Sequence, residues 1–513
     1  MRSRGSLTLW LRRSVIRGRT ALLALGALAL ILRLFDIAGE SVWLDEASVV
    51  TEIQRSSFAE MRDASRITFP GSPPLYHYGM YGWGNLVGVS ELALRLPSAL
   101  FGTVAVLLAA WLLRSGGAPT AVAVLAPLAM ALNATHIEYS QEARCYALFV
   151  ALATWSSLAY LRLGERGRAK HSIPLLYIVA TSSLLYTHIY AFFVLGAQWF
   201  VHAVDGESRR RFAWRRWLGL QIIIALLYVP WGRTMAAQVA LEFEPEGGHT
   251  FLDPPNLGTI PHILKQLSGG DLWADGWIAF GLLCAGVALA AWTWIRDERE
   301  SRRSGKPTSA LRLQRYLFAW LIFIIGAPTL VSITITPILG DVRYVLPAIV
   351  PFVSLGIWGI IRLPGRAGTA LSLAVLAATA ASLPRYYGES QREPWREVGR
   401  LLELNAEPEE ALLLDAPWIS QPIVYYFKGP NRLIGLERTK RADRLDASWA
   451  AARAEVEPER PIWLVLAFDL GTGREYLERI LCERRIDLQW HLQSIDLYRF
   501  APVEASPPVA PLH

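Results

Sequence analysis

Eleven apolar segments dominate the first three quarters of this 513-residue chain. A helix needs about 17 to 25 mostly apolar residues to span the hydrocarbon core of a bilayer. The segments that meet or approach this length are 20–36, 95–113, 118–135, 145–161, 172–188, 190–204, 217–232, 273–295, 316–336, 344–361 and 367–382. They predict a polytopic α-helical membrane protein with about 11 transmembrane helices, and the short segment 190–204 gives the count an error of one.

Arginines and lysines in the connections predict the orientation, because cytoplasmic loops are enriched in both residues. With the N-terminus inside, the inner connections carry 25 basic residues and the outer ones carry seven. The first segment has no A-x-A-like cleavage site before "RLFDIAGESVWLDE", so it is predicted to remain as a span. We therefore expect a multi-pass protein of the plasma (inner) membrane, with a cytoplasmic N-terminus and an extracytoplasmic C-terminal domain.

The basic charge belongs to this topology and does not indicate nucleic-acid binding. The net charge of +7 is spread over short clusters between the apolar segments. The chain is 53% hydrophobic with a mean hydropathy of +0.28, which excludes an ordinary soluble protein. Cys145, Cys284 and Cys482 lie far apart, so we expect neither a disulfide framework nor a cysteine metal site.

The pattern changes after the last apolar segment. "EEALLLDAP", "NRLIGL", "RPIWLVLAF" and "IDLQWHL" are typical of strands, whereas "PWISQPIVYYF", "DASWAAARAEV" and "REYLERILCERR" have helical spacing. Residues 1–382 are thus predicted to form the membrane domain, with a first outer loop at 37–93. Residues 383–513 are predicted to form an α/β domain that helps to position the acceptor, with a disordered Pro-rich tail at 502–513.

Charged and aromatic residues collect at the outer ends of the predicted spans. Asp45 and Glu46 in "SVWLDEASVV" follow the first span directly. The other outer-end residues are Glu138, Tyr139, Glu142, Arg144, His188, Asp341, Arg343 and Tyr344. Ionisable residues at membrane depth are costly and usually mark function. The pattern predicts a pocket of carboxylates, arginines and aromatics at the outer leaflet boundary.

Such a pocket suits sugar transfer from a lipid phosphate. The anomeric carbon of a lipid-linked sugar lies at headgroup level, and the phosphate is the leaving group. A carboxylate must accept the proton of the attacking hydroxyl, and cations must hold the departing phosphate. Asp45 is the candidate base, and Arg144 with Arg343 are candidates for the phosphate.

The motifs then carry a family resemblance. "WLDEA", "PPLYHYGMYGW", "SELALRLPSALFG", "YSQEARCYALFV", "YTHIYAFF" and "RYVLPAIVPF" follow one another as in the GT-C membrane glycosyltransferases. The chain most resembles the family-39, protein-mannosyltransferase-like bacterial branch, which includes relatives of the lipid A aminoarabinose transferase. "REPWREVGRLLELNAEPEEALLL" is also similar to this branch, and the resemblance covers roughly residues 20 to 400.

The resemblance implies an inverting transferase with a polyprenyl-phosphate-linked sugar donor and an extracytoplasmic active site. The acceptor is left open among protein, lipid and glycan. Asp45 and Glu46 are then the catalytic acid pair, with Asp45 as general base. The residues expected to bind the donor or acceptor are Tyr139, Glu142, Arg144, His77, His188, Arg343 and Tyr344.

A metal is left undecided by the sequence. Asp45 with Glu138 or Glu142 offers oxygen ligands for Mg or Mn, but the arginines make a divalent cation dispensable, so we expect no required cofactor. The alternative functions are a transporter or flippase of lipid-linked sugars and a non-catalytic lipid-binding scaffold. A transporter needs ionisable residues or broken helices near the midplane, and spans seven to eleven contain no ionisable residues in their centres.

Structural roles compete with the functional ones for several residues. Asp45 and Glu46 also suit the first turn of a helix, and Arg144, His188 and Arg343 also suit interfacial anchors. The connection 233–272 contains Gly247-Gly248 and Asp253-Pro254-Pro255, which favour a mobile lid over the lipid phosphate.

Overall fold

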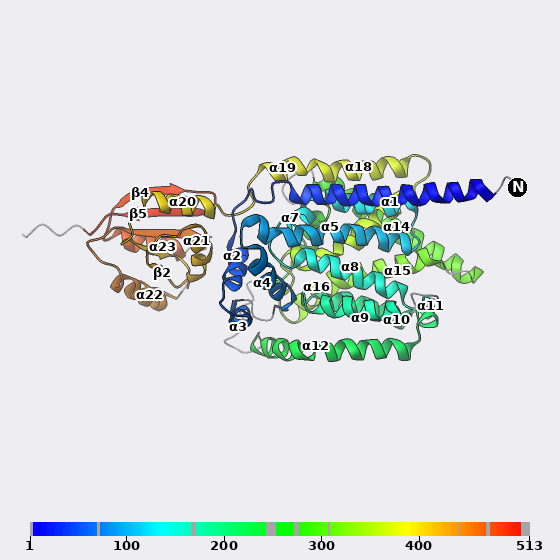
Figure 1. Ribbon diagram of the computed structural model, residues 1–513, viewed down its shortest axis with the longest axis horizontal. Helices are drawn as coiled ribbons and strands as arrows, with labels where there is room; N and C mark the ends of the chain where they lie inside the picture. The colour runs from blue at the N-terminus through cyan, green and yellow to red at the C-terminus, as the bar shows by residue number, and fades with distance from the viewer. Residues whose placement is uncertain are drawn as a thin grey trace, which may run out of the picture. The chain divides into compact units, whose positions relative to one another are not determined.

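Two compact units make up the chain (Figure 1). The computed structural model describes residues 4–68, 72–165, 171–242, 253–270, 276–305, 308–439, 441–467 and 472–503. Unit 1 comprises residues 1–37 and 57–389, and unit 2 comprises residues 38–56 and 390–513. Residues 38–56, which the sequence groups with the first outer loop, therefore fold with the C-terminal residues. The predicted tail from residue 504 onward lies outside the described residues.

Unit 1 is a bundle of helices that run side by side (Figure 1). Its elements are α1 (Arg4–Leu34), α3 (Phe58–Thr68), α4 (Leu75–Val87), α5 (Glu91–Ser115), α6 (Thr120–Leu132), α7 (Ala134–Glu138), α8 (Tyr146–Arg162), α9 (Ser172–Leu185), α10 (Ala191–Val204), α11 (Gly206–Arg211), α12 (Trp214–Glu242), α13 (Thr259–Leu267), α14 (Gly276–Ser304), α15 (Ser309–Leu321), η2 (Ile322–Gly326), α16 (Ala327–Thr334), η3 (Val342–Ala348), α17 (Ile349–Ile361), α18 (Ala367–Ala381) and α19 (Leu383–Gly388). Each of the eleven predicted segments coincides with one of these helices or with adjoining pieces of one.

Six helices among the described residues are long and apolar enough to cross a membrane. They are Glu91–Ser115, Trp214–Ala237, Gly276–Ser304, Ser309–Thr334, Val342–Ile361 and Ala367–Gly388. Three shorter apolar helices, α6, α9 and α10, accompany them. The prediction of a largely helical, multi-pass protein is therefore confirmed, whereas the count of eleven crossings stays a prediction.

Helix α17 is the most deeply packed of the six, because 89% of its apolar window is buried inside the bundle. Gly356 and Gly359 on α17 lie against Gly286 on α14, and a Cβ at any of the three would collide with the opposite backbone. Small residues let membrane helices approach closely and gain van der Waals contact. The sequence therefore builds a glycine seam that fixes α17 against α14.

Two local features of unit 1 differ from the sequence predictions. Helix α12 continues to Glu242 beyond the predicted end at residue 232, and α13 forms inside the predicted lid. Residues 243–252 of that lid lie outside the described residues. Between α15 and α16, a π-helical turn, η2, precedes Pro328, whose ring and missing N–H interfere with regular i to i−4 bonding.

Unit 2 is a three-layer α/β structure on a five-stranded sheet. Its elements are α2 (Leu44–Ile53), α20 (Trp395–Asn405), β1 (Ala411–Leu414), η4 (Pro417–Ile419), α21 (Ser420–Tyr426), β2 (Leu433–Gly435), α22 (Ala442–Ala454), β3 (Ile462–Ala467), α23 (Thr472–Leu481), β4 (Ile486–His491) and β5 (Ile495–Phe500). The strand order is β2-β1-β3-β5-β4, with β1, β2 and β3 parallel and the other pairings antiparallel.

Both faces of this sheet are covered because its strands are apolar on both sides. Leu412, Leu414 and Trp463 pack with α20 and α21, whereas Leu413 and Leu464 pack with α22 and α23. Continuous apolar runs are typical of strands buried on both faces. The predicted alternation is confirmed: the four predicted strands are β1, β2, β3 and β4, and the three predicted helices, α21, α22 and α23, lie between them in the sequence.

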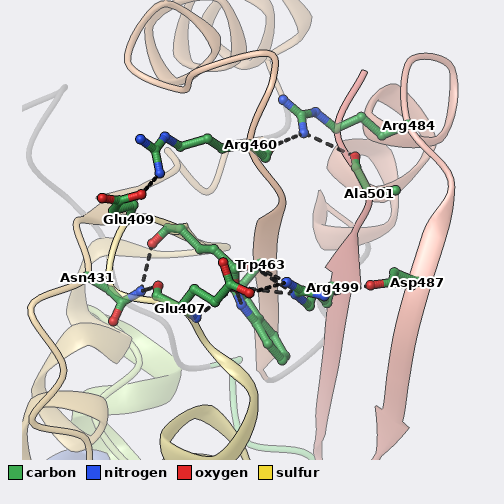
Figure 2. A network of polar contacts seen from close by, with 10 residues as sticks. Glu407, Glu409, Asn431, Arg460, Trp463, Arg484, Asp487, Arg499 and Ala501 are labelled. Atoms are coloured by element: carbon green, nitrogen blue, oxygen red, sulfur yellow. Dashed lines mark hydrogen bonds and ion pairs between the residues drawn. The ribbon is translucent and has the colours of Figure 1, made fainter. Parts of the chain in front are cut away.

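The strand β5 is the element that the sequence analysis missed. It forms a hairpin with β4 and inserts between β4 and β3. Arg499 on β5 lies opposite Trp463 on β3, and both side chains donate to the buried carboxylate of Glu410. Figure 2 shows Arg499 between Trp463 and Asp487, to which its Nη1 donates at 2.7 Å. This network explains why a strand carrying Arg499 is accepted inside the sheet.

Candidate active site

Asp45 and Glu46 occupy the first turn of α2 in unit 2. The partial positive charge of a helix N-terminus favours carboxylates at this position. Asp45 is half-buried, whereas Glu46 is completely buried. The predicted helix-start role is thus compatible with the structure, and the two acids have different surroundings.

Arg392 holds the buried acid in place. Its Nη1 lies 3.1 Å from Oε2 of Glu46, and its Nε lies 3.3 Å from Oε2 of Glu40. Ser48, one turn after Leu44 on α2, hydrogen-bonds Gln421 at the start of α21. These contacts fix the orientation of α2 within unit 2, and so the direction in which its first turn presents Asp45.

Glu393, next to Arg392, shares the electrostatic surroundings of Asp45. Burial raises the pKa of Glu393, and the negative charge of Asp45 adds to that rise, while Arg392 opposes it. Two carboxylates that repel one another make protonation of one favourable.

In unit 1, the turn between α7 and α8 carries Tyr139, Glu142 and Arg144. The fully buried Arg33 of α1 braces this turn through Ser140, whose Oγ accepts from Nε at 3.2 Å. Gln141 donates from Nε2 to the carbonyl oxygens of Arg33 and Phe35, at 3.0 and 2.7 Å. The end of α1 therefore sets the conformation of the turn.

The start of η3 lies beside this turn. Asp341 caps η3 by accepting from the backbone N–H of Arg343 at 2.9 Å, and its Oδ1 lies 3.3 Å from the hydroxyl of Tyr139. Arg343 lies over the ring of Tyr344, 5.3 Å from its centroid, and Arg144 lies 6.0 Å from the centroid of Tyr146. Both guanidinium groups are thus supported by aromatic rings.

His188 occupies the turn between α9 and α10, at the centre of the aromatic rings. It stacks on Phe149 at 4.6 Å between centroids, and its ring lies 6.0 Å from Tyr344. The Nδ1 atom accepts from the backbone N–H of Tyr190, which leaves the proton of the neutral ring on Nε2.

The charges of this cluster act on its titratable groups. Burial, and then the positive charges of Arg144 and Arg343, lower the pKa of His188 to about 3. Burial, followed by the nearby carboxylates of Glu138 and Asp341, raises the pKa of Tyr139 well above its ordinary value. At neutral pH the histidine and tyrosine are uncharged, so the arginines supply the positive potential.

Six predicted residues therefore come together in unit 1, and we call them the arginine–aromatic cluster: Tyr139, Glu142, Arg144, His188, Arg343 and Tyr344. His77 on α4 is held differently, with its Nε2 3.4 Å from the hydroxyl of Ser72. The backbone N–H of Leu75 donates to the carbonyl oxygen of Tyr186, so α4 begins beside the α9–α10 turn.

Sequence reasoning missed the residues that support these groups. Arg392 and Glu393 lie roughly 350 positions after Asp45, and only the family-like "REPW" stretch hinted at them. Tyr190 and Tyr146 look like ordinary interfacial aromatics in the sequence. Their contribution depends on loops that only the packed bundle brings together.

A metal would need a set of ligands in one place. Among the residues that the structure describes, no three His, Cys, Asp or Glu side chains are grouped in a way that would hold a metal ion. Asp45 and Glu142, a pair considered from the sequence, belong to different units.

Comparisons with known proteins show the fold. No protein-family model matches the chain, and no curated protein matches its sequence. ArnT from Cupriavidus metallidurans bound to undecaprenyl phosphate matches with a TM-score of 0.56 and 14% identity, over 93% of this chain and 97% of that one. The apo state of that protein matches with a TM-score of 0.51 and 14% identity, over 96% and 98%.

A second solved protein is similar in fold. The Archaeoglobus fulgidus oligosaccharyltransferase, in complex with Zn and sulfate, matches with a TM-score of 0.51 and 12% identity, over 90% of this chain and 69% of that one. These identities establish likeness of fold. The GT-C fold predicted from the motifs is confirmed.

Proposed function

We propose that this chain is an integral-membrane glycosyltransferase that takes a sugar from a polyprenyl-phosphate donor and transfers it, with inversion, to an acceptor on the extracytoplasmic face. The observation that carries the proposal is its likeness, over nearly its full length, to ArnT bound to undecaprenyl phosphate. The arginine–aromatic cluster adds the chemistry that a lipid-linked phosphate requires.

Asp45 is the proposed base. Its carboxylate takes the proton of the acceptor hydroxyl, and the hydroxyl oxygen forms the new bond to the anomeric carbon. The bond between that carbon and the phosphate oxygen breaks, and its electron pair leaves with the lipid phosphate. Glu46 is buried on Arg392, so it serves by holding the first turn of α2.

Arg144 and Arg343 are the proposed phosphate ligands. A guanidinium stays charged at all relevant pH values and matches two phosphate oxygens at once. The aromatic rings beside them restrict their motion and offer apolar surface to the sugar and the lipid tail. His188, kept neutral by burial and then by those two charges, donates its Nε2 proton to an oxygen of the donor.

The donor is identified by lipid retention. Purified protein is incubated with membrane lipid extract, washed, and the retained lipids are analysed by mass spectrometry. We expect a polyprenyl-phosphate monosaccharide, whose tail fills the apolar surface between helices. Retention and turnover of a nucleotide sugar would refute the proposal, and retention of the lipid without turnover by any acceptor fraction would favour the transporter alternative.

The base is tested by Asp45→Asn, since an amide cannot take the acceptor proton. We expect sugar transfer from the identified donor to fall by about 10² to 10⁴-fold, with donor retention unchanged. Asp63→Asn is the matched control, because Asp63 is an exposed carboxylate of α3 paired with Arg62. An Asp45→Asn protein with near-normal turnover would remove Asp45 from the mechanism.

A further inference from the structure

One end of the bundle in unit 1 carries a group of arginines that the transfer reaction does not use. At this end, α11 joins the end of α10 to the start of α12 (Figure 1). The group, which we call the basic corner, comprises Arg209, Arg210 and Arg211 of α11, Arg215 and Arg216 of α12, and Arg312 of α15. Helix α10 lies between this corner and His188, and its 14 residues span about 20 Å.

The positive charge of the basic corner is not compensated within the described part of the chain. None of its arginines forms an ion pair with a described carboxylate. Two acids belong to the same segment, and the first of them, Asp205, caps α11 and already pairs with Arg315 at 2.5 Å. The second, Glu207, is half-buried. Six arginines therefore share one carboxylate whose charge is not already matched, and the corner attracts anions.

Arg312 is the most deeply buried arginine of the corner, with 8% of its surface exposed. Together with Arg211 and Ser208 it lines a small pocket of about 10 Å³, which admits about one oxygen atom or water molecule. The charges of Arg211, Glu207 and Asp205 all act on it, but its guanidinium contacts no described carboxylate. A buried guanidinium is costly without an anion in contact, so an anionic oxygen at the mouth of this pocket would be favourable.

Aromatic stacking fixes the first turn of α12 in the corner. The ring of His202, near the end of α10, stacks on Trp214 and on Trp217, with centroids 5.3 and 4.6 Å apart. Trp199, one turn earlier on α10, meets both indoles edge-on at 5.9 Å. The two exposed arginines between these tryptophans are thus presented from a fixed backbone, which lowers the entropy lost on binding.

An apolar surface begins at the corner and runs along α12. Trp214, Ile222 and Leu226 are exposed and share one face of this helix, because they are spaced by multiples of four residues. The helix is long and apolar enough to cross a membrane, and only 28% of its apolar window is buried in the bundle. Tryptophan at the end of such a helix is typical of the headgroup level. The corner therefore joins a cationic surface to a surface for hydrocarbon chains, and an amphipathic anion fits both.

We propose that the basic corner binds the phosphate of an anionic phospholipid, whose acyl chains lie along the exposed face of α12. One phosphate oxygen lies at the pocket of Arg211 and Arg312, and the other arginines add positive potential. Zwitterionic lipids fit less well, because their own ammonium group would meet the arginines. The proposal does not depend on the transfer reaction, since none of these residues belongs to the proposed active site.

The test uses the full-length protein in nanodiscs of equimolar phosphatidylglycerol, phosphatidylethanolamine and phosphatidylcholine, followed by native mass spectrometry of the retained lipids. We expect preferential retention of phosphatidylglycerol. The triple variant Arg210→Gln, Arg215→Gln, Arg216→Gln changes only exposed side chains and should lower that retention about tenfold. Arg312→Gln should lower it about threefold, whereas Arg312→Lys, which keeps the charge, should retain most of it.

The matched control is the triple variant Arg296→Gln, Arg299→Gln, Arg302→Gln. It removes the same charge from exposed positions of α14, and two of these arginines pair with acids of α14 itself. Arg315 links α14 to the cap of α11, so both triple variants change the same end of the bundle. The control should retain phosphatidylglycerol as the unmodified protein does. Equal losses in the two triple variants, or equal retention of the three lipids, would overturn the proposal.

Inorganic phosphate distinguishes a lipid from a free ion as the occupant. Added to the nanodiscs at constant ionic strength, it should leave phosphatidylglycerol bound, because it cannot replace the contact of the acyl chains with α12. Full displacement of the lipid by inorganic phosphate would assign the corner to a soluble anion and would overturn the proposal.

Discussion

Arg33 in unit 1 and three buried carboxylates in unit 2 are held in opposite ways. In unit 1, Arg33 is completely buried, and its recorded hydrogen bonds go to neutral acceptors: Ser140, Nδ1 of His136 at 2.6 Å and the carbonyl oxygens of Ala29 and Ala131. Among the described residues, no carboxylate forms an ion pair with it.

In unit 2, three buried carboxylates are each paired with a guanidinium. Glu46 lies on Arg392, Glu410 on Arg499 and Asp415 on Arg438. Figure 2 shows the Arg499 network, in which a second acid, Asp487, also takes part.

The two arrangements differ in what remains buried after the arginine is removed. A buried ion pair that loses its cation leaves an uncompensated charge, whereas a buried cation on neutral acceptors leaves only unpaired dipoles. Removing Arg392 should therefore be more harmful than removing Arg33, and two measurements compare these variants.

Arg392→Met is expected to lower the stability of the protein more than any other change considered. Glu46 would remain fully buried without its cation, which destabilises a protein by about 3 to 5 kcal/mol. Chemical denaturation followed by the fluorescence of the unit 2 tryptophans measures the change. The double variant Arg392→Met, Glu46→Gln should recover much of the loss, and absence of recovery would show that the pair is not the cause.

For Arg33→Met, we expect the free energy of unfolding to fall by a smaller amount, about 1 to 2 kcal/mol. This change removes hydrogen bonds to Ser140 and His136 but also removes the cost of burying a charge. Thermal unfolding in detergent measures it. A loss as large as that of Arg392→Met would break the comparison and would point to an acidic partner for Arg33.

His188 is expected to affect stability least at neutral pH. Burial, and then Arg144 and Arg343, lower its pKa to about 3. Because the folded protein holds this histidine neutral, stability is fully present above the ordinary histidine pKa of about 6.5 and is lost as the pH falls towards 3. Between these two pH values, the free energy of unfolding falls by about 1 kcal/mol for each pH unit.

His188→Gln should remove this acid sensitivity, since the amide can still accept from the N–H of Tyr190 without titrating. Thermal unfolding of the variant and the unmodified protein at pH 7, 6 and 5 measures the difference. Parallel pH profiles would show that His188 is not held neutral by its surroundings.

The sequence alone determined the classes of structure in both units. Apolar length predicted the helices of unit 1, and alternating apolar strands and helices predicted unit 2, because each pattern reflects burial of local segments. The motifs also named the residues of the arginine–aromatic cluster, since charged and aromatic residues at span ends are visible in one dimension.

Only the tertiary structure decided the groupings that join distant segments. It paired Glu46 with Arg392, set Glu393 near Asp45, inserted β5 into the sheet and braced the turn between α7 and α8 with Arg33. It also brought Arg211 and Arg312 to one pocket. Such contacts depend on packing between elements hundreds of residues apart, and local periodicity carries no information about them.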